Sequence, residues 1–260
     1  MKGNGIRTID AHTHVQFEQY DNDRDGVITR ALAAGVGMIN AGADLKLSRD
    51  AVDLAHKYED GIWATVGIHP TESKDFDKFG EIEKLAQDSK VVGIGECGLD
   101  YFRDKEFEVQ KRQKEIFERH IKLSNKIKKP LVIHCREAFA DIIGILTVHK
   151  SELLPEPGIL HFFTGNIEDA KKLLELNFSF TFGGLVTFDR SFDKIIEFIP
   201  LEKLLVETDA PFVSPKSHRG ERNEPLYIEE VIPVIAAIKR TDEEKTRKQL
   251  LENTKRVFGT

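Results

Sequence analysis

Cysteine is scarce in this sequence: Cys97 and Cys135 are the only two among 260 residues. They lie far apart and form no CxxC spacing, which excludes a disulfide framework and a thiolate zinc cluster. The sequence also lacks an apolar run long enough to span a bilayer, and its N-terminal stretch MKGNGIRTIDAHTHV lacks the apolar core of a signal peptide. We therefore expect a cytoplasmic protein that does not associate with membranes.

An excess of positive charge is absent as well. The formal net charge of −6 argues against wrapping a nucleic acid by general electrostatic attraction, so any polyanion must meet local Lys and Arg side chains. With 40% hydrophobic and 32% charged residues, the chain has enough apolar side chains for a core beneath a solvated surface. This composition is typical of a globular enzyme and not of a disordered chain.

Short apolar runs alternate with longer amphipathic segments, the pattern of parallel strands joined by crossover helices. Eight strands are expected: Arg7–Asp10, Gly37–Ala41, Ile62–Gly67, Val91–Gly95, Pro130–His134, Gly158–His161, Phe178–Phe182 and Leu204–Thr208. No linker rich in Pro, Gly or Ser divides the chain. The sequence therefore predicts an α/β fold, a single (β/α)8 TIM barrel, with one domain over residues 1–260.

Helical periodicity is clearest over Val109–Lys126, where apolar residues recur against a charged face. Short polar side chains indicate helix starts at Ser48–Asp50 and at Asn166–Asp169.

Chemistry-bearing residues gather where the predicted strands end, which is the face on which barrel enzymes build active sites. His12 and His14 follow the first strand with the spacing of side chains that share one side of an extended chain, so they suit a shared metal ion. Glu96 follows an apolar strand, where a bridging position between cations or a salt bridge to a neighbour would offset its desolvation.

Three further strands end in the same way. His134 and His161 each close an apolar strand; a single such histidine is usually a core residue, but two are harder to explain by packing. Asp209 follows the eighth strand and suits both metal binding and proton acceptance from water, although an Asp before Ala-Pro also forms turns. Glu207 points the same way by strand alternation and is a candidate supporting residue.

Together these residues supply six candidate ligands, His12, His14, Glu96, His134, His161 and Asp209. Imidazole and carboxylate without thiolate suit Zn, Mn, Mg or a similar divalent ion, and one shareable carboxylate makes the set sufficient for two ions. The sequence thus predicts hydrolysis by a metal-activated water.

The ordered motifs resemble those of the TatD family of metal-dependent deoxyribonucleases, within the amidohydrolase-like superfamily. The resemblance spans nearly the whole chain and rests on DAHTH (10–14), VGIHP (66–70), GIGECGLDYFR (93–103), PLVIHCREA (130–138), HFFTG (161–165), ETDAPF (207–212) and RGERNEP (219–225). It implies a cytoplasmic nuclease acting on DNA ends and, for some members, a deacylase acting on D-aminoacyl-tRNA.

The resemblance also implies roles for residues. His12, His14 and Asp209 would hold one ion, while His134 and His161 would hold the other. Glu96 would bridge the two ions, and His69 would lie beside the reacting phosphate. Thr71 stands where the family often has a second histidine.

Candidate anion-binding residues are Arg136, just past His134, and Arg219, Arg222 and Asn223 after the eighth strand. The planar guanidinium suits phosphate oxygens, although an exposed loop Arg is usually only a solubilising charge. Tyr101, Phe102 and Phe163 are expected near the same rim, where packing is the ordinary role and base stacking the functional alternative.

The leading hypothesis is therefore a metal-dependent DNase acting on single-stranded or damaged ends. One alternative keeps the metals and changes the bond to an ester or amide, as in deacylation of aminoacyl-tRNA. The other is a barrel without catalysis that binds metal or nucleic acid. Nothing in the sequence indicates an obligate protein partner.

Overall fold

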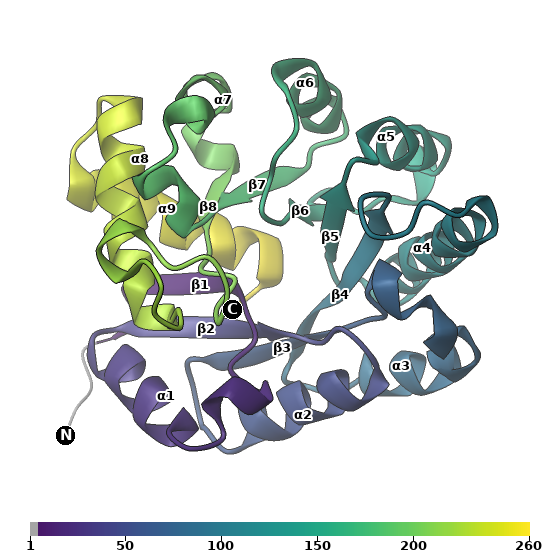
Figure 1. The fold of residues 1–260 in the computed structure, drawn as a ribbon, viewed down its shortest axis with the longest axis horizontal. Coiled ribbons are helices and arrows are strands. Elements are labelled where there is room, and N and C mark those ends of the chain that lie inside the picture. Colours follow the sequence, from purple (N-terminus) through teal and green to yellow (C-terminus); the bar gives the residue numbers. More distant parts are fainter. Residues whose placement is uncertain (1–4) are drawn as a thin grey trace.

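The computed structural model describes residues 5–260, in which eight parallel strands form one sheet in the order β1 to β8. The strands are β1 (Thr8–Thr13), β2 (Val36–Ala41), β3 (Ile62–Val66), β4 (Val91–Asp100), β5 (Leu131–Arg136), β6 (Gly158–Leu160), β7 (Ser179–Phe182) and β8 (Leu204–Val206). Helices surround the ring of strands (Figure 1). They are α1 (Arg24–Ala33), α2 (Leu45–His56), α3 (Phe79–Leu85), α4 (Phe107–Ile127), α5 (Phe139–Val148), α6 (Ile167–Glu175), α7 (Asp193–Phe198), α8 (Val231–Lys239) and α9 (Glu243–Phe258).

The chain closes the barrel where the segment after β8 meets the end of β1. The amide of Asp209 donates to the carbonyl of His12 at 3.0 Å, and the amide of His14 donates to the carbonyl of Ala210 at 2.8 Å. These bonds draw the two ends of the sheet together at the carboxyl ends of the strands. The predicted (β/α)8 barrel is confirmed.

Two apolar layers hold the barrel together. Residues between the strands and the outer helices make the larger cluster. A smaller cluster combines Ile9, Ile39 and Leu205 of the strands with Val257 and Phe258 at the end of α9. The end of α9 therefore packs with side chains of the strands, and the polar side chains described below lie at the other ends of those strands.

Strand β4 carries an irregularity next to the functional residues. Its pairing with β5 shifts register between Ile94 and Cys97. Gly95 and Gly98 have φ of 152° and 129°, and a Cβ on Gly98 would lie 2.0 Å from the carbonyl oxygen of His134. Only glycine allows this close approach, and such bulges commonly re-aim a side chain beside an active site.

The expected elements are present, with shifted ends. β1 and β4 extend beyond their predicted ends at Asp10 and Gly95, and the helix predicted over Val109–Lys126 spans Phe107–Ile127. Asn166 caps α6, as predicted, and forms a reciprocal capping box with Asp169.

The start of α2 was predicted wrongly at Ser48–Asp50. The helix begins at Leu45, because Asp44 accepts a hydrogen bond from the amide of Leu47. Ser48 is instead buried, with its hydroxyl donating to the carbonyl of Gly67.

The single-domain organisation of residues 1–260 stays a prediction, and its first four residues lie outside the described part of the chain. Within residues 5–260, no helix has the length and apolarity needed to cross a membrane.

Candidate metal centre

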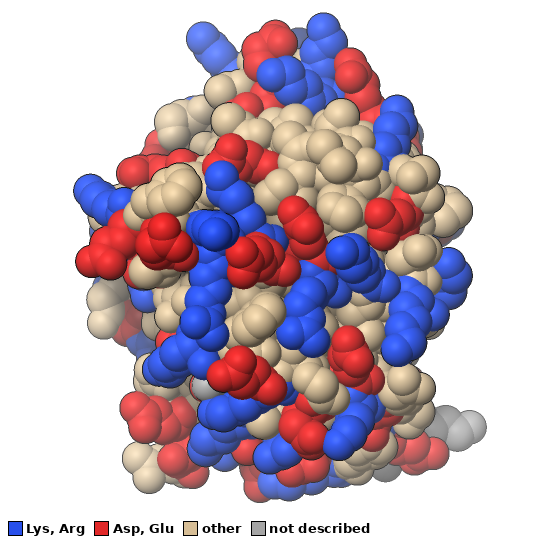
Figure 2. Space-filling model, turned by 90° about the vertical axis from the view of Figure 1, so that its right-hand side faces the viewer, with Lys and Arg blue, Asp and Glu red and all other residues tan. Residues whose placement is uncertain are grey.

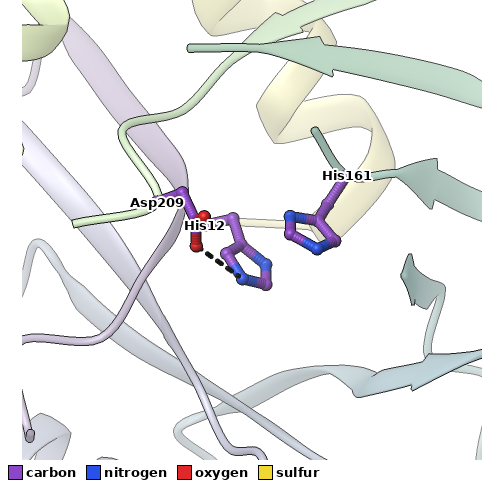
Figure 3. A group of neighbouring side chains, drawn as sticks. All are labelled: His12, His161 and Asp209. Carbon is purple, nitrogen blue, oxygen red and sulfur yellow. Dashed lines mark ion pairs between the residues drawn. The ribbon is translucent and has the colours of Figure 1, made fainter. Parts of the chain in front are cut away.

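The six candidate ligands converge at one end of the barrel, although they come from five different strands or strand ends. His12 lies in β1 with His14 just after it, Glu96 in β4 and His134 in β5. His161 follows β6 and Asp209 follows β8. Figure 3 shows His12, His161 and Asp209 gathered from three of these elements, with the ion pair between His12 and Asp209 dashed.

Glu96 stands in the middle of the cluster, and its two carboxylate oxygens face different groups. Oε2 lies 3.4 Å from Nε2 of His12 and 3.7 Å from Nε2 of His14. Oε1 lies 3.1 Å from Nδ1 of His134 and 3.0 Å from Nε2 of His161. Each pair of histidines therefore faces a different oxygen of Glu96.

Asp209 completes the group around His12 and His14. Its Oδ1 lies 3.7 Å from Nε2 of His12 and 3.5 Å from Nε2 of His14. The aspartate has a left-handed φ of 53°, and the backbone contact with β1 described above holds it there. Its side chain keeps partial exposure, so it faces both the buried histidines and the open end of the barrel.

The spacing of the facing nitrogens fits bound cations. Nε2 of His12 and Nε2 of His14 lie 3.1 Å apart, and Nδ1 of His134 lies 3.3 Å from Nε2 of His161. In a tetrahedral zinc site with bonds of about 2.1 Å, neighbouring ligand atoms lie roughly 3.4 Å apart. The residues present therefore fit a metal centre. Their ligand atoms come close enough to share an ion in three groups: His12, His14 and Glu96; His69, Glu96 and His134; and His12, His161 and Asp209.

Hydrogen bonds to the outer ring nitrogens orient two of the histidines. Nδ1 of His14 lies 2.9 Å from the carbonyl oxygen of Ala41, and Nε2 of His134 lies 3.1 Å from Oδ2 of Asp100. In the neutral ring each contact requires the outer nitrogen to carry the proton, so the lone pair of the inner nitrogen faces the cluster. This is the tautomer that a metal ligand needs.

Buried carboxylates support the cluster from behind. Asp10 accepts hydrogen bonds from the amide and the hydroxyl of Thr208 and from the amide of His12. Glu207 accepts from the amide of Phe162 at 2.6 Å, and its Oε2 lies 3.7 Å from Nδ1 of His161. The predicted inward orientation of Glu207 is confirmed.

The electrostatics of the cluster favour an ionised Glu96. Burial alone raises the pKa of this carboxyl, but the imidazoles that surround it, those of His69 and His161 first, hold it well below its usual range. Burial likewise opposes the charged form of Asp209, and its closeness to His14, His161 and His12 lowers its pKa. Both carboxylates are therefore anionic at neutral pH.

His69 joins the cluster through a different tautomer. The amide of Thr71 donates to its Nδ1 at 3.2 Å, which leaves the proton of the neutral ring on Nε2. That nitrogen lies 3.2 Å from Oε1 of Glu96. Burial lowers the pKa of His69 and keeps the ring neutral. The geometry makes His69 a hydrogen-bond donor at the edge of the cluster.

Two of the four predicted anion-binding residues are available at the surface. Arg136 is exposed at the end of β5, with its guanidinium carbon 3.9 Å from the ring centroid of Phe102. Arg219 is exposed in the loop after β8 and lies 4.1 Å from the ring centroid of Phe188. Within residues 5–260 neither arginine forms an ion pair with a carboxylate, so both keep their hydrogen-bond donors for a ligand.

Arg222 and Asn223 are placed differently from the expectation. Arg222 forms a two-pronged ion pair with Asp23 and donates to the carbonyl of Gln19. Asn223 is 0% exposed, and its amide nitrogen donates to the carbonyls of Thr208, Phe212 and Val213. The polar atoms of both side chains are already bonded to other parts of the protein. Both side chains therefore hold in place the loop that carries them.

The rim aromatics follow the packing alternative in two cases. Phe163 is buried among other aromatic rings, and the hydroxyl of Tyr101 donates to Asp141. Phe102 is exposed, but the guanidinium of Arg136 lies over its ring.

Sequence reasoning missed Asp100 as a supporting residue. The available signal was its spacing from Glu96, since residues four apart in a strand face the same side. Gly95 just before Glu96 and Gly98 between the two residues hid the fact that β4 continues as far as Asp100.

Comparison with known proteins agrees with this geometry. Residues 9–259 match the family model described as "TatD related DNase". The chain is 38% identical to YabD of Bacillus subtilis, named a metal-dependent hydrolase, over 96% of this chain and 98% of that one. It is 34% identical to the 3′-5′ ssDNA/RNA exonuclease TatD of Citrobacter koseri, over 96% and 98% of the two chains.

Solved structures show the same architecture. The crystal structure of YjjV, a TatD homologue from Escherichia coli, superposes with a TM-score of 0.90 at 27% identity, over 98% of this chain and 99% of that one. A family match over nearly the whole chain, relatives above 30% identity and a shared barrel all agree. This protein is therefore a metal-dependent hydrolase that belongs to the TatD-related DNase family.

Proposed function

We propose that this protein is a nuclease that binds two divalent cations and hydrolyses phosphodiester bonds at single-stranded ends of DNA. One observation carries the proposal: the two oxygens of Glu96 face two separate ligand groups, His12 with His14 and His134 with His161. A carboxylate shared between two nearby cations has this arrangement. The exonuclease activity named for the relative from Citrobacter koseri supports a nucleic-acid substrate.

The donor set indicates which cations suit the centre. It combines imidazole nitrogens with carboxylate oxygens and contains no thiolate, which suits Zn or Mn, with Mg as the harder alternative. When bound, a pair of such cations lowers the pKa of a water molecule and stabilises charge on phosphate oxygens.

Asp209 is the proposed proton acceptor. It is ionised, it lies beside His12 and His14, and its side chain keeps partial exposure toward the open end of the barrel. A carboxylate in this position accepts the proton of the attacking water. Glu96 lies between the two groups of ligands.

His69 and two arginines are the proposed phosphate contacts. Nε2 of His69 carries a proton at the edge of the cluster, which suits a phosphate oxygen. Arg136 and Arg219 keep their donors free of carboxylates among the described residues, and each lies over an aromatic ring that orients it. Such contacts position a backbone without reading base sequence.

Arg222 and Asn223, also predicted to contact substrate, are proposed to act through the loop that they hold. Their engaged donors and the burial of Asn223 favour this role over direct contact with a phosphate.

End-labelled oligonucleotides test the proposal directly. Metal-stripped protein should leave a single-stranded DNA oligonucleotide intact, and addition of Mn²⁺ or Zn²⁺ should restore shortening from one end. Asp209→Asn should reduce the rate by at least a hundredfold, since it removes the proton acceptor and one ligand. RNA and aminoacyl-tRNA assayed in parallel separate the nuclease from the deacylase. Cleavage that survives complete metal removal, or hydrolysis of the aminoacyl ester alone, would refute the proposal.

A further inference from the structure

Two phenylalanine rings form a corner beside the metal centre. The rings of Phe17 and Phe212 have centroids 6.3 Å apart and planes at 76°, and we call this pair the aromatic corner. Phe17 stacks on His14 with centroids 4.5 Å apart, and Phe212 meets His14 edgewise at 6.4 Å. The aromatic corner is thus built directly on a proposed metal ligand.

Phe212 is displayed to solvent by a strained segment. Its side chain is 45% exposed, and neighbouring Val213 is 37% exposed. Val213 has a φ of 48°, which is costly for a β-branched residue and persists only where surrounding contacts enforce it. Asn223 supplies such contacts, because its amide donates to the carbonyls of Phe212 and Val213. Burial of Phe212 in the core does not explain this arrangement.

Space for a ligand adjoins the other ring. Phe17 lines a cleft of about 710 Å³ between the β1–α1 loop and α2. Arg24 and Lys46 also line this cleft, together with acidic residues such as Asp50. Phe17 therefore has open space beside it, on the side of the β1–α1 loop and α2.

We propose that the aromatic corner binds an unpaired nucleobase of the nucleotide next to the scissile phosphodiester; this inference rests on the proposed function. With the rings at 76°, a base lying flat on one ring presents its edge to the other. Base stacking on aromatic side chains tolerates any base, because every base has a π-face. A base inside a duplex is already stacked on its neighbours, so the corner selects single-stranded or frayed ends.

Two other exposed aromatic rings are less suited to this role. Phe102 has the guanidinium of Arg136 over its ring, and Phe107 lies at the start of α4 with 74% of its surface exposed. Among the described residues, neither ring stacks on a proposed metal ligand. Phe107 therefore provides a matched control, an exposed phenylalanine outside the corner.

The test uses the metal-loaded enzyme and compares two substrates. One is an oligonucleotide with all its bases, and the other is the same oligonucleotide with the terminal base removed. The measured quantity is the ratio of kcat/KM for the first to kcat/KM for the second. Phe212→Leu keeps an apolar side chain but removes the ring, and we expect it to lower this ratio roughly tenfold. Phe212→Trp restores a ring, so it and Phe107→Leu should keep the ratio within about twofold of wild type.

A ratio unchanged in Phe212→Leu, or lowered equally in Phe107→Leu, would overturn the aromatic corner while leaving the nuclease in place. If the wild-type enzyme cleaves neither oligonucleotide, the proposed function fails, and binding then decides the corner. In that case fluorescence anisotropy measures the binding of the same two oligonucleotides, both made resistant to cleavage. Weaker binding of only the complete oligonucleotide to Phe212→Leu supports the corner, and equal losses for both oligonucleotides refute it.

Discussion

At the scale of single residues, Glu96 has the largest predicted effect. Glu96→Gln keeps the volume of the side chain but removes the charge that both ligand groups share. We expect metal content to fall from two equivalents to one or none, and hydrolysis to fall by about a thousandfold, since a metal ion contributes several kcal/mol to the transition state. Metal analysis by mass spectrometry and the oligonucleotide assay measure the two effects. Glu175→Gln on the exposed side of α6 is the control, and a Glu96→Gln protein with full metal content and activity would contradict this assignment.

For Asp100 we predict a smaller effect on metal binding. It holds Nε2 of His134 at 3.1 Å, and Asp100→Asn can no longer enforce the tautomer that presents Nδ1 to the cluster. Loss of such an orienting carboxylate typically weakens metal affinity 10- to 100-fold. Titration against a competing chelator measures the change. Asp141→Asn, which breaks a surface ion pair with Lys114, should leave the affinity unaltered; an equal loss in both variants would show that Asp100 has no specific role.

The candidate ligands could be predicted from the sequence, whereas the residues that hold the loops in place could not. His134 and His161 were recognisable because each ends an apolar strand, where packing alone rarely explains a polar side chain. The engagement of Arg222 depends on Asp23, which lies 199 residues earlier, and no local pattern reports such a pairing.

At the scale of elements, His120 ties α4 to the loop that carries His69. Its Nδ1 donates to the carbonyl of Ile116, and its Nε2 accepts from the amide of Ile68, so the buried ring is satisfied only when neutral. Burial lowers the pKa of His120 to about 4. Because the unfolded chain takes up a proton near pH 6.5, this residue contributes its full stability above that pH and loses it as the pH falls toward 4.

The predicted consequence is a specific acid sensitivity. Between pH 7 and pH 4 the wild-type protein should lose roughly 3 kcal/mol more unfolding free energy than His120→Asn, which cannot titrate in this range. Urea unfolding at several pH values measures the difference. Parallel stability curves for the two proteins would show that His120 does not titrate on unfolding.

Elements were predicted well where apolar runs are continuous and poorly where glycine interrupts them. All eight strands were expected, but β4 continues through Gly95 and Gly98 to Asp100 because the close approach of β5 requires glycine there. The start of α2 was wrong because Asp44 and Ser48 are both good capping residues, and only tertiary packing buries the second.

At the scale of the whole molecule, charge is mixed and the candidate phosphate contacts are local. Figure 2 shows one side of the protein on which Lys and Arg are interspersed with Asp and Glu. Together with the net charge of −6, this favours weak affinity for nucleic acid that depends on a few arginines.

Salt dependence separates the arginines by role. Arg136→Ala and Arg219→Ala should each reduce the slope of log K against log salt by about 0.7 for a single-stranded oligonucleotide, because each removes one phosphate contact. Arg222→Ala should keep the slope and lower the urea midpoint, since its charge is already paired with Asp23. Equal slopes in all three variants would contradict the division of roles.

We propose that six side chains from separate parts of the barrel hold two cations, with Glu96 between them. Crystals soaked in Mn²⁺ or Zn²⁺ and measured at the metal absorption edge test it most directly. We predict two anomalous peaks about 3.5–4 Å apart, one on each side of the Glu96 carboxylate. A single peak, or peaks that do not contact Glu96, would rule out a carboxylate shared between two cations.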